Sequence, residues 1–130
     1  MQKHLPAVKV LVVDDTPEVL EMVVEMLEQH GAVVTAVATA AEALEILKIE
    51  RPDVLVSDLE MPEKDGCWLI GRVRALPPEE GGLTPAACLT GRTEPEARAR
   101  VLQAGFQYHI PKPIRMDRLV GVVGILALKP

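Results

Sequence analysis

The stretch that decides the fold is Val54-Leu55-Val56-Ser57-Asp58-Leu59-Glu60-Met61-Pro62-Glu63-Lys64-Asp65-Gly66. It starts as an unbroken run of β-branched and aliphatic residues and then changes to acids, a Met-Pro break and an Asp-Gly turn. A continuous apolar run bounded by turn signals is typical of a strand covered on both faces, as in a parallel sheet. We therefore predict a buried strand that ends at Asp58. Strand-end aspartates most often only open a turn, but open α/β sheets also bind their ligands at the carboxyl ends of strands.

Four further apolar runs predict the other strands. They are 9–13, which ends on Asp14-Asp15, 33–37, 86–89, which ends at Thr90, and 108–110, which is followed by Pro111-Lys112-Pro113. Segments with apolar residues at helical spacing separate them. Strands that alternate with helices through short connections predict right-handed βαβ crossovers and a parallel sheet with helices on both faces. The predicted fold class is therefore α/β.

Start and stop signals bound the predicted helices. Thr16 and Pro17 predict a helix start, through a capping hydroxyl and a proline at a position that needs no donor. Two pairs, Thr39 with Glu42 and Thr93 with Glu96, have the spacing of a capping box. The other predicted boundaries are His30-Gly31 and Arg51-Pro52 as the ends of the first two helices, 66–76 for the third, Gly105 as the end of the fourth, and a last helix from Met116. The Pro- and Gly-rich segment 77–85 is predicted to be a surface loop.

The composition restricts the class of protein. The 130 residues correspond to one domain, and 48% hydrophobic but only 2% aromatic residues predict a core of aliphatic side chains. A formal net charge of -5 without a basic run argues against direct nucleic-acid binding. Because no secretory signal or membrane-length apolar run is visible, we expect a cytoplasmic protein without membrane contact. Cys67 and Cys88 are expected to be reduced thiols rather than part of a zinc site.

Polar residues collect where the predicted strands end, namely Asp14, Asp15, Asp58, Thr90 and Lys112. Parallel strands present their carboxyl ends at one edge of the sheet, so these side chains should meet there. Three close carboxylates need a compensating charge, which a hard cation or the ammonium of Lys112 would supply. Oxygen ligands without His or Cys select Mg²⁺, Mn²⁺ or Ca²⁺. A carboxylate, a magnesium ion, a lysine and a hydroxyl together form a phosphoryl-transfer set.

Taken together, these motifs resemble the response-regulator receiver domain of two-component signalling. The segments that carry the resemblance span nearly the whole chain: Val10-Leu11-Val12-Val13-Asp14-Asp15, Ser57-Asp58-Leu59-Glu60-Met61-Pro62, Asp65-Gly66, Thr90-Gly91, Ala104-Gly105-Phe106 and Pro111-Lys112-Pro113. The resemblance implies one receiver domain over residues 1–130, with a flavodoxin-like (βα)5 fold and strand order 2-1-3-4-5. It extends to single-domain regulators and to receivers of hybrid histidine kinases. No output domain is expected after the last helix.

The resemblance also implies a role for each site residue. Asp58 is the expected phosphoacceptor, which takes a phosphoryl group from the phosphohistidine of a histidine kinase or a phosphotransfer protein. Asp15 and Asp58 would bind Mg²⁺ (or Mn²⁺) directly, Asp14 through water, and Glu60 through its backbone carbonyl. Thr90 would form a hydrogen bond with the phosphoryl group, and Lys112 would form an ion pair with the acyl phosphate. The Lys112-Pro113 bond is expected to be cis, which would direct Lys112 into the site. The domain would act as a phosphoacceptor rather than as an enzyme. Its fourth helix, fifth strand and fifth helix would form a switching surface for a downstream protein of unknown identity.

Two positions depart from the usual family pattern. His109 stands where receivers most often carry the Tyr or Phe that switches together with Thr90, although His resembles the receivers of hybrid kinases. An ordinary half-buried ring is the favoured interpretation, and a pH-dependent coupling is the alternative. Gly91 replaces a common Ala, and Glu60 and Arg92 flank the expected path of attacking water. We predict that this pair sets the lifetime of the acyl phosphate.

Three other classes of protein share some of these features. A phosphatase of the haloacid-dehalogenase type would need Asp-x-Asp after the first strand, where this chain has Asp14-Asp15-Thr16. A flavodoxin would need a hydroxyl-rich phosphate loop at that place. A receiver-like docking module that is never phosphorylated would usually lack one of the acids or the lysine. Phosphatase turnover, flavin absorbance and failure to phosphorylate would identify these three alternatives.

Overall fold

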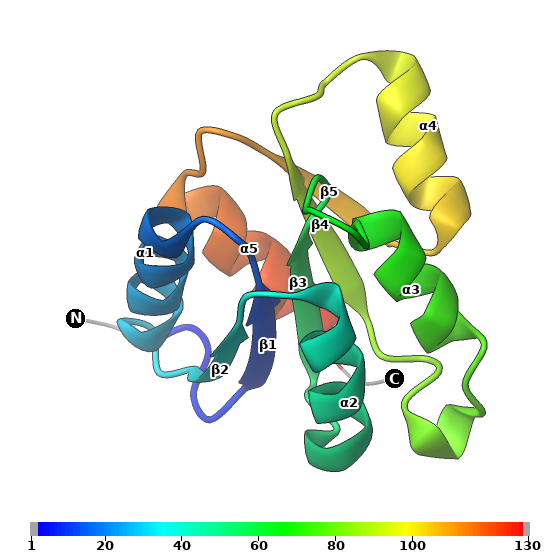
Figure 1. The fold of residues 1–130 in the computed structure, drawn as a ribbon. Helices are drawn as coiled ribbons and strands as arrows, with labels where there is room; N and C mark the ends of the chain where they lie inside the picture. The colour runs from blue at the N-terminus through cyan, green and yellow to red at the C-terminus, as the bar shows by residue number, and fades with distance from the viewer. Residues whose placement is uncertain (1–2, 129–130) are drawn as a thin grey trace.

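The strands form a single parallel sheet (Figure 1). The computed structural model describes residues 3–128. Its strands are β1 (Lys9–Val13), β2 (Val33–Val37), β3 (Val54–Asp58), β4 (Ala86–Thr90) and β5 (Tyr108–Pro111), in the order 2-1-3-4-5. All four neighbouring pairs are parallel, and a helix separates each strand from the next. The predicted flavodoxin-like α/β fold is confirmed.

Helices cover both faces of this sheet (Figure 1). They are α1 (Pro17–Glu28), α2 (Ala40–Glu50), α3 (Gly66–Arg74), α4 (Pro95–Ala104) and α5 (Met116–Leu126). Successive strand residues point to opposite faces. Val10 and Val12 accordingly pack with α1 and α5, whereas Leu11 and Val13 pack with α2, α3 and α4. The core therefore has two halves, and the sheet lies between them.

The two central strands of the site are buried along their whole length. Every residue of β3 and of β4 is buried, including the polar Ser57, Asp58 and Thr90. The continuous apolar run in 54–56 predicted this, because a strand covered by helices on both faces needs no polar side. The edge strand β2 is only partly buried.

The predicted start of α1 at Thr16 and Pro17 is confirmed, but only one of the three predicted capping side chains, that of Thr39, makes its capping bond. Thr39 caps α2 as predicted, and its hydroxyl accepts a hydrogen bond from the backbone N–H of Glu42 at 3.2 Å. Thr16 stands at the N-cap of α1, but its side chain makes no capping bond. The Thr93–Glu96 box does not form, because α4 begins at Pro95 and Glu94 takes the N-cap position. A proline at the first helical turn has no N–H to satisfy and a backbone already set for the helix, so it fixes the start of α4 one residue later than the box predicts.

The third helix is also shorter than predicted. It ends at Arg74 instead of reaching Leu76, and a short 3-10 turn over 78–80 interrupts the predicted loop. Residues before a proline are pushed out of helical geometry, and Pro77 and Pro78 follow directly. Gly105 ends α4 with a φ of 128°, as its type predicted.

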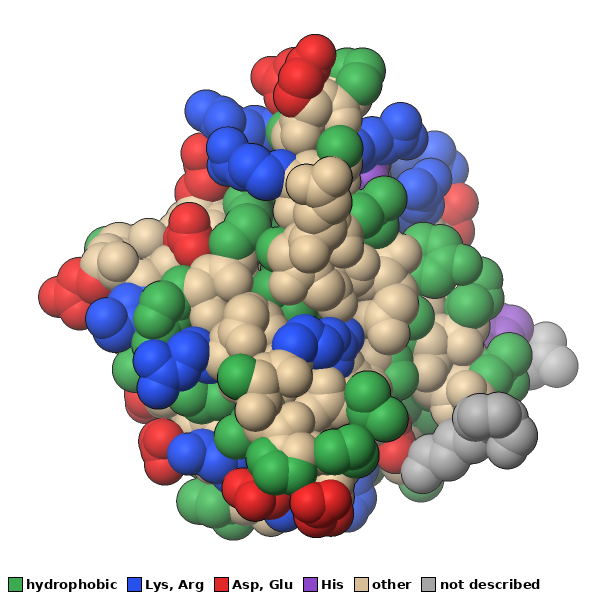
Figure 2. All heavy atoms as spheres, turned by 90° about the vertical axis from the view of Figure 1, so that its right-hand side faces the viewer, with side chains coloured by type: hydrophobic (Ala, Val, Ile, Leu, Met, Phe, Trp, Pro, Cys, Tyr) green, Lys and Arg blue, Asp and Glu red, His purple; other side chains and the backbone are tan. Residues whose placement is uncertain are grey.

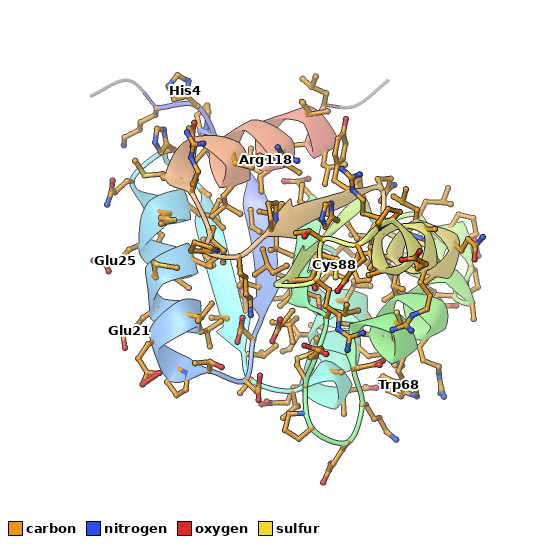
Figure 3. The ribbon with its side chains drawn as sticks, turned by 90° about the horizontal axis from the view of Figure 1, so that it is seen from above. His4, Glu21, Glu25, Trp68, Cys88 and Arg118 are labelled. Carbon is orange, nitrogen blue, oxygen red and sulfur yellow. The ribbon has the colours of Figure 1, made fainter. Side chains whose placement is uncertain are left out.

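The outer helix faces carry the charges. Glu21 and Glu25 point away from the sheet on the solvent side of α1 (Figure 3). No helix within residues 3–128 has the length and apolar character needed to cross a membrane.

Candidate functional site

Five predicted site residues meet at the carboxyl edge of the sheet because of where the strands end. Asp58 is the last residue of β3, Asp14 and Asp15 follow β1, and Thr90 is the last residue of β4. Lys112 follows β5, and its backbone N–H donates to the carbonyl of Thr90 at 2.9 Å. The strand order places β3 between β1 and β4, so the acids and the hydroxyl surround Asp58.

Lys112 and Asp58 form the central contact of the site. The Nζ of Lys112 donates to Oδ1 of Asp58 at 2.9 Å and lies 3.7 Å from Oδ2 of Asp14. The Asp14 side chain is fully buried, that of Asp58 is 6% exposed and that of Lys112 is 29% exposed. The Lys112-Pro113 peptide bond is cis, as the resemblance implied. One ammonium therefore serves two buried carboxylates.

The carboxylates are arranged as a cluster that fits a hard cation. One oxygen from each of Asp14, Asp15 and Asp58 lies within 4.8 Å of the others. Oδ1 of Asp14 accepts a hydrogen bond from the backbone N–H of Thr16 at 2.9 Å, while Oδ2 is buried without a hydrogen-bond partner in the described residues. A buried carboxylate oxygen left in this way is costly unless a cation completes its shell. Three carboxylates without a soft ligand suit Mg²⁺ or Mn²⁺.

Burial and neighbouring charges perturb the two central groups in the same direction. Burial raises the pKa of Asp58, the hydrogen bond from Lys112 opposes this, and the negative charge of Asp14 adds to the rise, which prevails. Burial lowers the pKa of Lys112, but the hydrogen bond and charge of Asp58, with the charge of Asp14, raise it overall. The ammonium is therefore held charged, whereas the carboxylate of Asp58 lacks enough positive charge. A cation beside Asp58 would correct this deficit.

The loop after β3 supports the site through Gly66, which packs against the end of that strand. A Cβ at Gly66 would lie 2.5 Å from the carbonyl oxygen of Asp58, so only glycine fits there. The N–H of Gly66 donates to the carbonyl of Leu59 at 2.8 Å, and Asp65 caps α3 by accepting from the N–H of Trp68 at 2.8 Å. The Asp-Gly pair predicted a turn; its spacing of eight residues from Asp58 was the available signal for a packing role.

The residues predicted to modulate the site lie at its rim. Thr90 is buried, and its Oγ1 accepts a hydrogen bond from the backbone N–H of Arg92 at 2.9 Å. Arg92 and Glu60 form an ion pair of 3.4 Å whose two side chains are both more than half exposed. Both face solvent beside the acids rather than joining them.

His109 is not part of the acidic cluster. It lies on β5, in register with Cys88 of β4, and it is half-buried with its Nε2 lacking a hydrogen-bond partner among residues 3–128. Burial lowers the pKa of His109, and the positive charges of Arg98 and Arg118 lower it further. The favoured interpretation of an ordinary half-buried ring agrees with its burial, but its surroundings are strongly positive.

The two cysteines are free thiols in this structure, as expected. Cys88 is buried in β4, where burial raises the pKa of its thiol far above the ordinary value (Figure 3). Cys67 is partly buried at the start of α3. Within residues 3–128 neither belongs to a cluster that could hold a metal ion.

The structure is thus a doubly wound α/β domain that gathers three acids, a hydroxyl and a lysine at one edge of its sheet. The sequence pattern of the response regulator receiver domain matches residues 10–124. The chain belongs to this family of two-component signalling domains. The family match favours the receiver interpretation over the phosphatase and flavodoxin alternatives.

Two relatives illustrate the range of proteins that carry this domain. A 14.6 kDa protein encoded in the sodA1 3' region of Leptolyngbya boryana is 44% identical over 119 residues, which are 92% of this chain and 89% of the relative. The response regulator MprA of Mycobacterium ulcerans is 34% identical over 114 residues, 88% of this chain. The match spans only 47% of that regulator, about half of its length.

Solved structures show the same fold. The chemotaxis response regulator CheY4 of Vibrio cholerae is 30% identical with a TM-score of 0.85, and the match covers 92% of this chain and 98% of that one. The receiver domain of the sensor histidine kinase PA1611 from Pseudomonas aeruginosa is 27% identical with a TM-score of 0.85, over 93% of this chain and 98% of that one. The latter contains a magnesium ion coordinated in its active-site cleft.

Proposed function

We propose that Asp58 accepts a phosphoryl group from the phosphohistidine of a histidine kinase or a phosphotransfer protein. The observation that carries this proposal is the 2.9 Å contact between Lys112 Nζ and Asp58 Oδ1 beside the acidic cluster. A cationic lysine next to a carboxylate at a candidate magnesium site is the arrangement that phosphoryl transfer requires. A location in the cytoplasm, where such phosphodonors are charged by ATP, is part of this proposal.

Asp58 is a better acceptor than its two neighbours. Asp14 is fully buried, and one of its oxygens already accepts from Thr16. Asp15 is exposed and takes no part in the ion pairs with Lys112. Asp58 alone makes direct contact with the ammonium, and its side chain is 6% exposed whereas that of Asp14 is fully buried. An oxygen of Asp58 would attack phosphorus in line, the bond from phosphorus to the histidine nitrogen would break, and Lys112 would then pair with the acyl phosphate.

The acids would hold Mg²⁺ or Mn²⁺. Asp15 and Asp58 would bind it directly, Asp14 through water, and Glu60 through its backbone carbonyl. When bound, this ion neutralises the charge of the transferring phosphoryl group. The buried Oδ2 of Asp14 and the raised pKa of Asp58 both favour added positive charge at this position.

Thr90 and His109 would transmit the change. Modification adds about two negative charges to Asp58. The hydroxyl of Thr90 would donate to a phosphoryl oxygen, and because its Oγ1 also accepts from the N–H of Arg92, this movement would shift the start of the loop that leads to α4. The partly buried ring of His109 on β5 would follow the movement of that loop. The α4–β5–α5 surface would thereby change its affinity for a downstream protein.

Glu60 and Arg92 would set how long the modified state lasts. Their 3.4 Å ion pair bridges the loops that follow β3 and β4, at the rim of the site. Water has to pass these two side chains to attack the acyl phosphate, so the pair would slow hydrolysis. Replacing both with Gln should change the dephosphorylation rate of the purified phosphoprotein. An unchanged rate would reject this role for the pair.

Intact mass after incubation with Mg²⁺ and acetyl phosphate tests the acceptor. We expect a single phosphoryl adduct that is absent without Mg²⁺ and absent in Asp58→Asn. Asp117→Asn, on the exposed start of α5, is the matched control and should keep the adduct. An adduct that survives Asp58→Asn would show that another residue is the acceptor. Complete failure to phosphorylate the folded protein would favour the docking-module alternative.

A further inference from the structure

A groove beside β5 lies apart from the acidic site. It has a volume of about 280 Å³ and runs between α4 and α5. Its lining residues are Arg98 and Leu102 of α4, Gln107 before β5, Tyr108 and His109 of β5, and Arg118 of α5. It is part of the surface through which we propose that the phosphorylation signal leaves. Assigning a ligand to this groove therefore rests on that proposed function.

The groove is positive in a protein that is negative overall. The chain carries a formal net charge of -5, yet neither Arg98 nor Arg118 makes an ion pair with any acid in residues 3–128. Arg115, one turn earlier on the surface, does pair with Asp117 at 2.9 Å. Lys and Arg side chains lie on both flanks of α4 in the upper part of Figure 2. Within the part of the chain that the structure describes, the two groove arginines thus have no ion-pair partner.

Apolar groups accompany these charges. Leu102 is 52% exposed and Tyr108 is 37% exposed, and both line the same groove. Large apolar side chains next to unpaired arginines are typical of the central residues of protein interfaces, where Tyr and Arg are enriched. A polyanion such as nucleic acid would use the arginines but leave Leu102 and Tyr108 without apolar contacts.

We propose that this groove binds an acidic segment of a partner protein, with an Asp or Glu side chain between Arg98 and Arg118 and an apolar side chain against Leu102 and Tyr108. Arginine forms strong, oriented hydrogen bonds with carboxylates. Charge complementarity therefore selects an acidic occupant over a basic or neutral one. The strand β5 lines the groove through Tyr108 and His109 and leads on to Lys112, whose N–H donates to the carbonyl of Thr90, so the site and the groove share one strand.

His109 reports occupancy of the groove. The charged groups that face it are Arg98 from α4 and Arg118 from α5, while its register partner on β4 is the neutral thiol of Cys88. A carboxylate bound between the arginines offsets their charges, so the pKa of His109 rises on binding. By linkage, binding takes up part of a proton and strengthens as the pH falls through this range. An apolar occupant alone would bury the ring further and move the pKa downward.

Selection from a displayed library of random peptides tests the proposal. The phosphorylated wild-type protein is the bait, and the selected peptides are then measured by fluorescence anisotropy. We expect enriched sequences to combine Asp or Glu with an apolar residue and to bind the Arg98→Gln/Arg118→Gln variant about tenfold or more weakly. Arg72→Gln/Arg100→Gln removes the same charge outside the groove and should keep the affinity. In NMR titrations, peptide should raise the pKa of His109.

Several results would overturn the inference. They are the absence of binders, enriched peptides without acids, equal binding to both double variants, a fall in the pKa of His109, arginine-dependent self-association of the chain, and preferential binding of a labelled single-stranded oligonucleotide. The groove variant should still form the Asp58 adduct with acetyl phosphate, because neither arginine touches the acidic site. An adduct without acidic binders would reject the groove proposal alone. Failure of the wild-type protein to form the adduct would instead reject the proposed function.

Discussion

Replacing Lys112 with Met should destabilise the protein by an amount that depends on pH. Methionine has a similar length but no charge, so Lys112→Met removes the cation that lies 2.9 Å from Asp58 and 3.7 Å from Asp14. With an effective dielectric constant of about 20, the attraction lost to Asp58 alone is about 6 kcal/mol before solvation is considered. Removing one partner of a buried ion pair generally costs about 3–5 kcal/mol.

Protonation of Asp58 limits that loss. From its ordinary pKa of 3.8, neutralising the carboxyl at pH 7 costs about 4 kcal/mol, at about 1.36 kcal/mol for each unit. The lost attraction of about 6 kcal/mol exceeds this protonation cost of about 4 kcal/mol. The variant should therefore bind a proton at Asp58 rather than keep two unpaired buried carboxylates. Because solvent reaches the Lys112 side chain, which is 29% exposed, we expect a loss of about 3 kcal/mol at pH 7.

The sign of the pH dependence follows from the two pKa shifts. Asp58 has a raised pKa in the folded protein, so its ionisation lowers stability as the pH rises from its ordinary pKa through the folded one. Because the hydrogen bond and charge of Lys112 lower the pKa of Asp58, removing Lys112 raises that pKa further and extends this pH range upward. The stabilisation that Lys112 itself provides is present at neutral pH and is lost only above its ordinary pKa, as the pH passes its raised folded value. At pH 4.5 the deficit of the variant should shrink to about 1 kcal/mol, because the proton then costs little.

Urea unfolding provides the measurement. Far-UV circular dichroism and the fluorescence of Trp68, the single tryptophan, should give coincident transitions. Mg²⁺ should restore part of the stability, since it binds the folded acids and not the unfolded chain. Lys48→Met is the control: Lys48 pairs with Glu45 at 3.3 Å on the surface, and its loss should cost no more than about 0.5 kcal/mol. An equal loss at pH 7 and pH 4.5 for Lys112→Met would refute this electrostatic account.

Three further changes test packing rather than charge. Gly71→Ala should stabilise the protein by up to about 1 kcal/mol, because a Cβ there meets no atom within 4 Å. Gly66→Ala should instead destabilise the protein and weaken Mg²⁺ binding, because its Cβ would meet the backbone of Asp58. Urea melts with and without Mg²⁺ would measure both effects, and a stabilising Gly66→Ala would contradict the tight packing. Arg74→Ala should cost about 3 kcal/mol in the same melts, because the guanidinium donates to three backbone carbonyls and to the side chain of Gln107. A loss below about 1 kcal/mol would mean that solvent replaces these hydrogen bonds. Cys88 should resist alkylation in the native state and react in denaturant, and Cys67 should react slowly even in the folded protein, because burial raises the pKa of both thiols. Intact mass would count the modified thiols. Rapid labelling of Cys88 in the native protein would contradict its burial.

Local sequence determined most of the fold. The strands were predicted from short-range signals, namely the apolar run before Asp58 and the acids that follow residues 10–13. Such signals can be recognised from neighbouring residues alone, without knowledge of tertiary contacts. They predicted five strands, their parallel arrangement and the residues at their ends, while the order of the strands came from the resemblance. Helix starts were less secure, because the Thr93–Glu96 spacing competed with Pro95, and the backbone preference of proline prevailed.

The tertiary structure alone decided the properties that depend on distance and burial. The sequence brought Asp14, Asp58 and Lys112 to one edge, but only the packing fixed an ammonium between two buried carboxylates and left one oxygen of Asp14 without a hydrogen-bond partner among the described residues. It also revealed that Gly66 presses against the carbonyl of Asp58, and that Arg98 and Arg118 converge on His109 from different helices. Such contacts join residues far apart in the chain. The free energy of a charge depends on what surrounds it in space, and spacing along the sequence does not encode that environment.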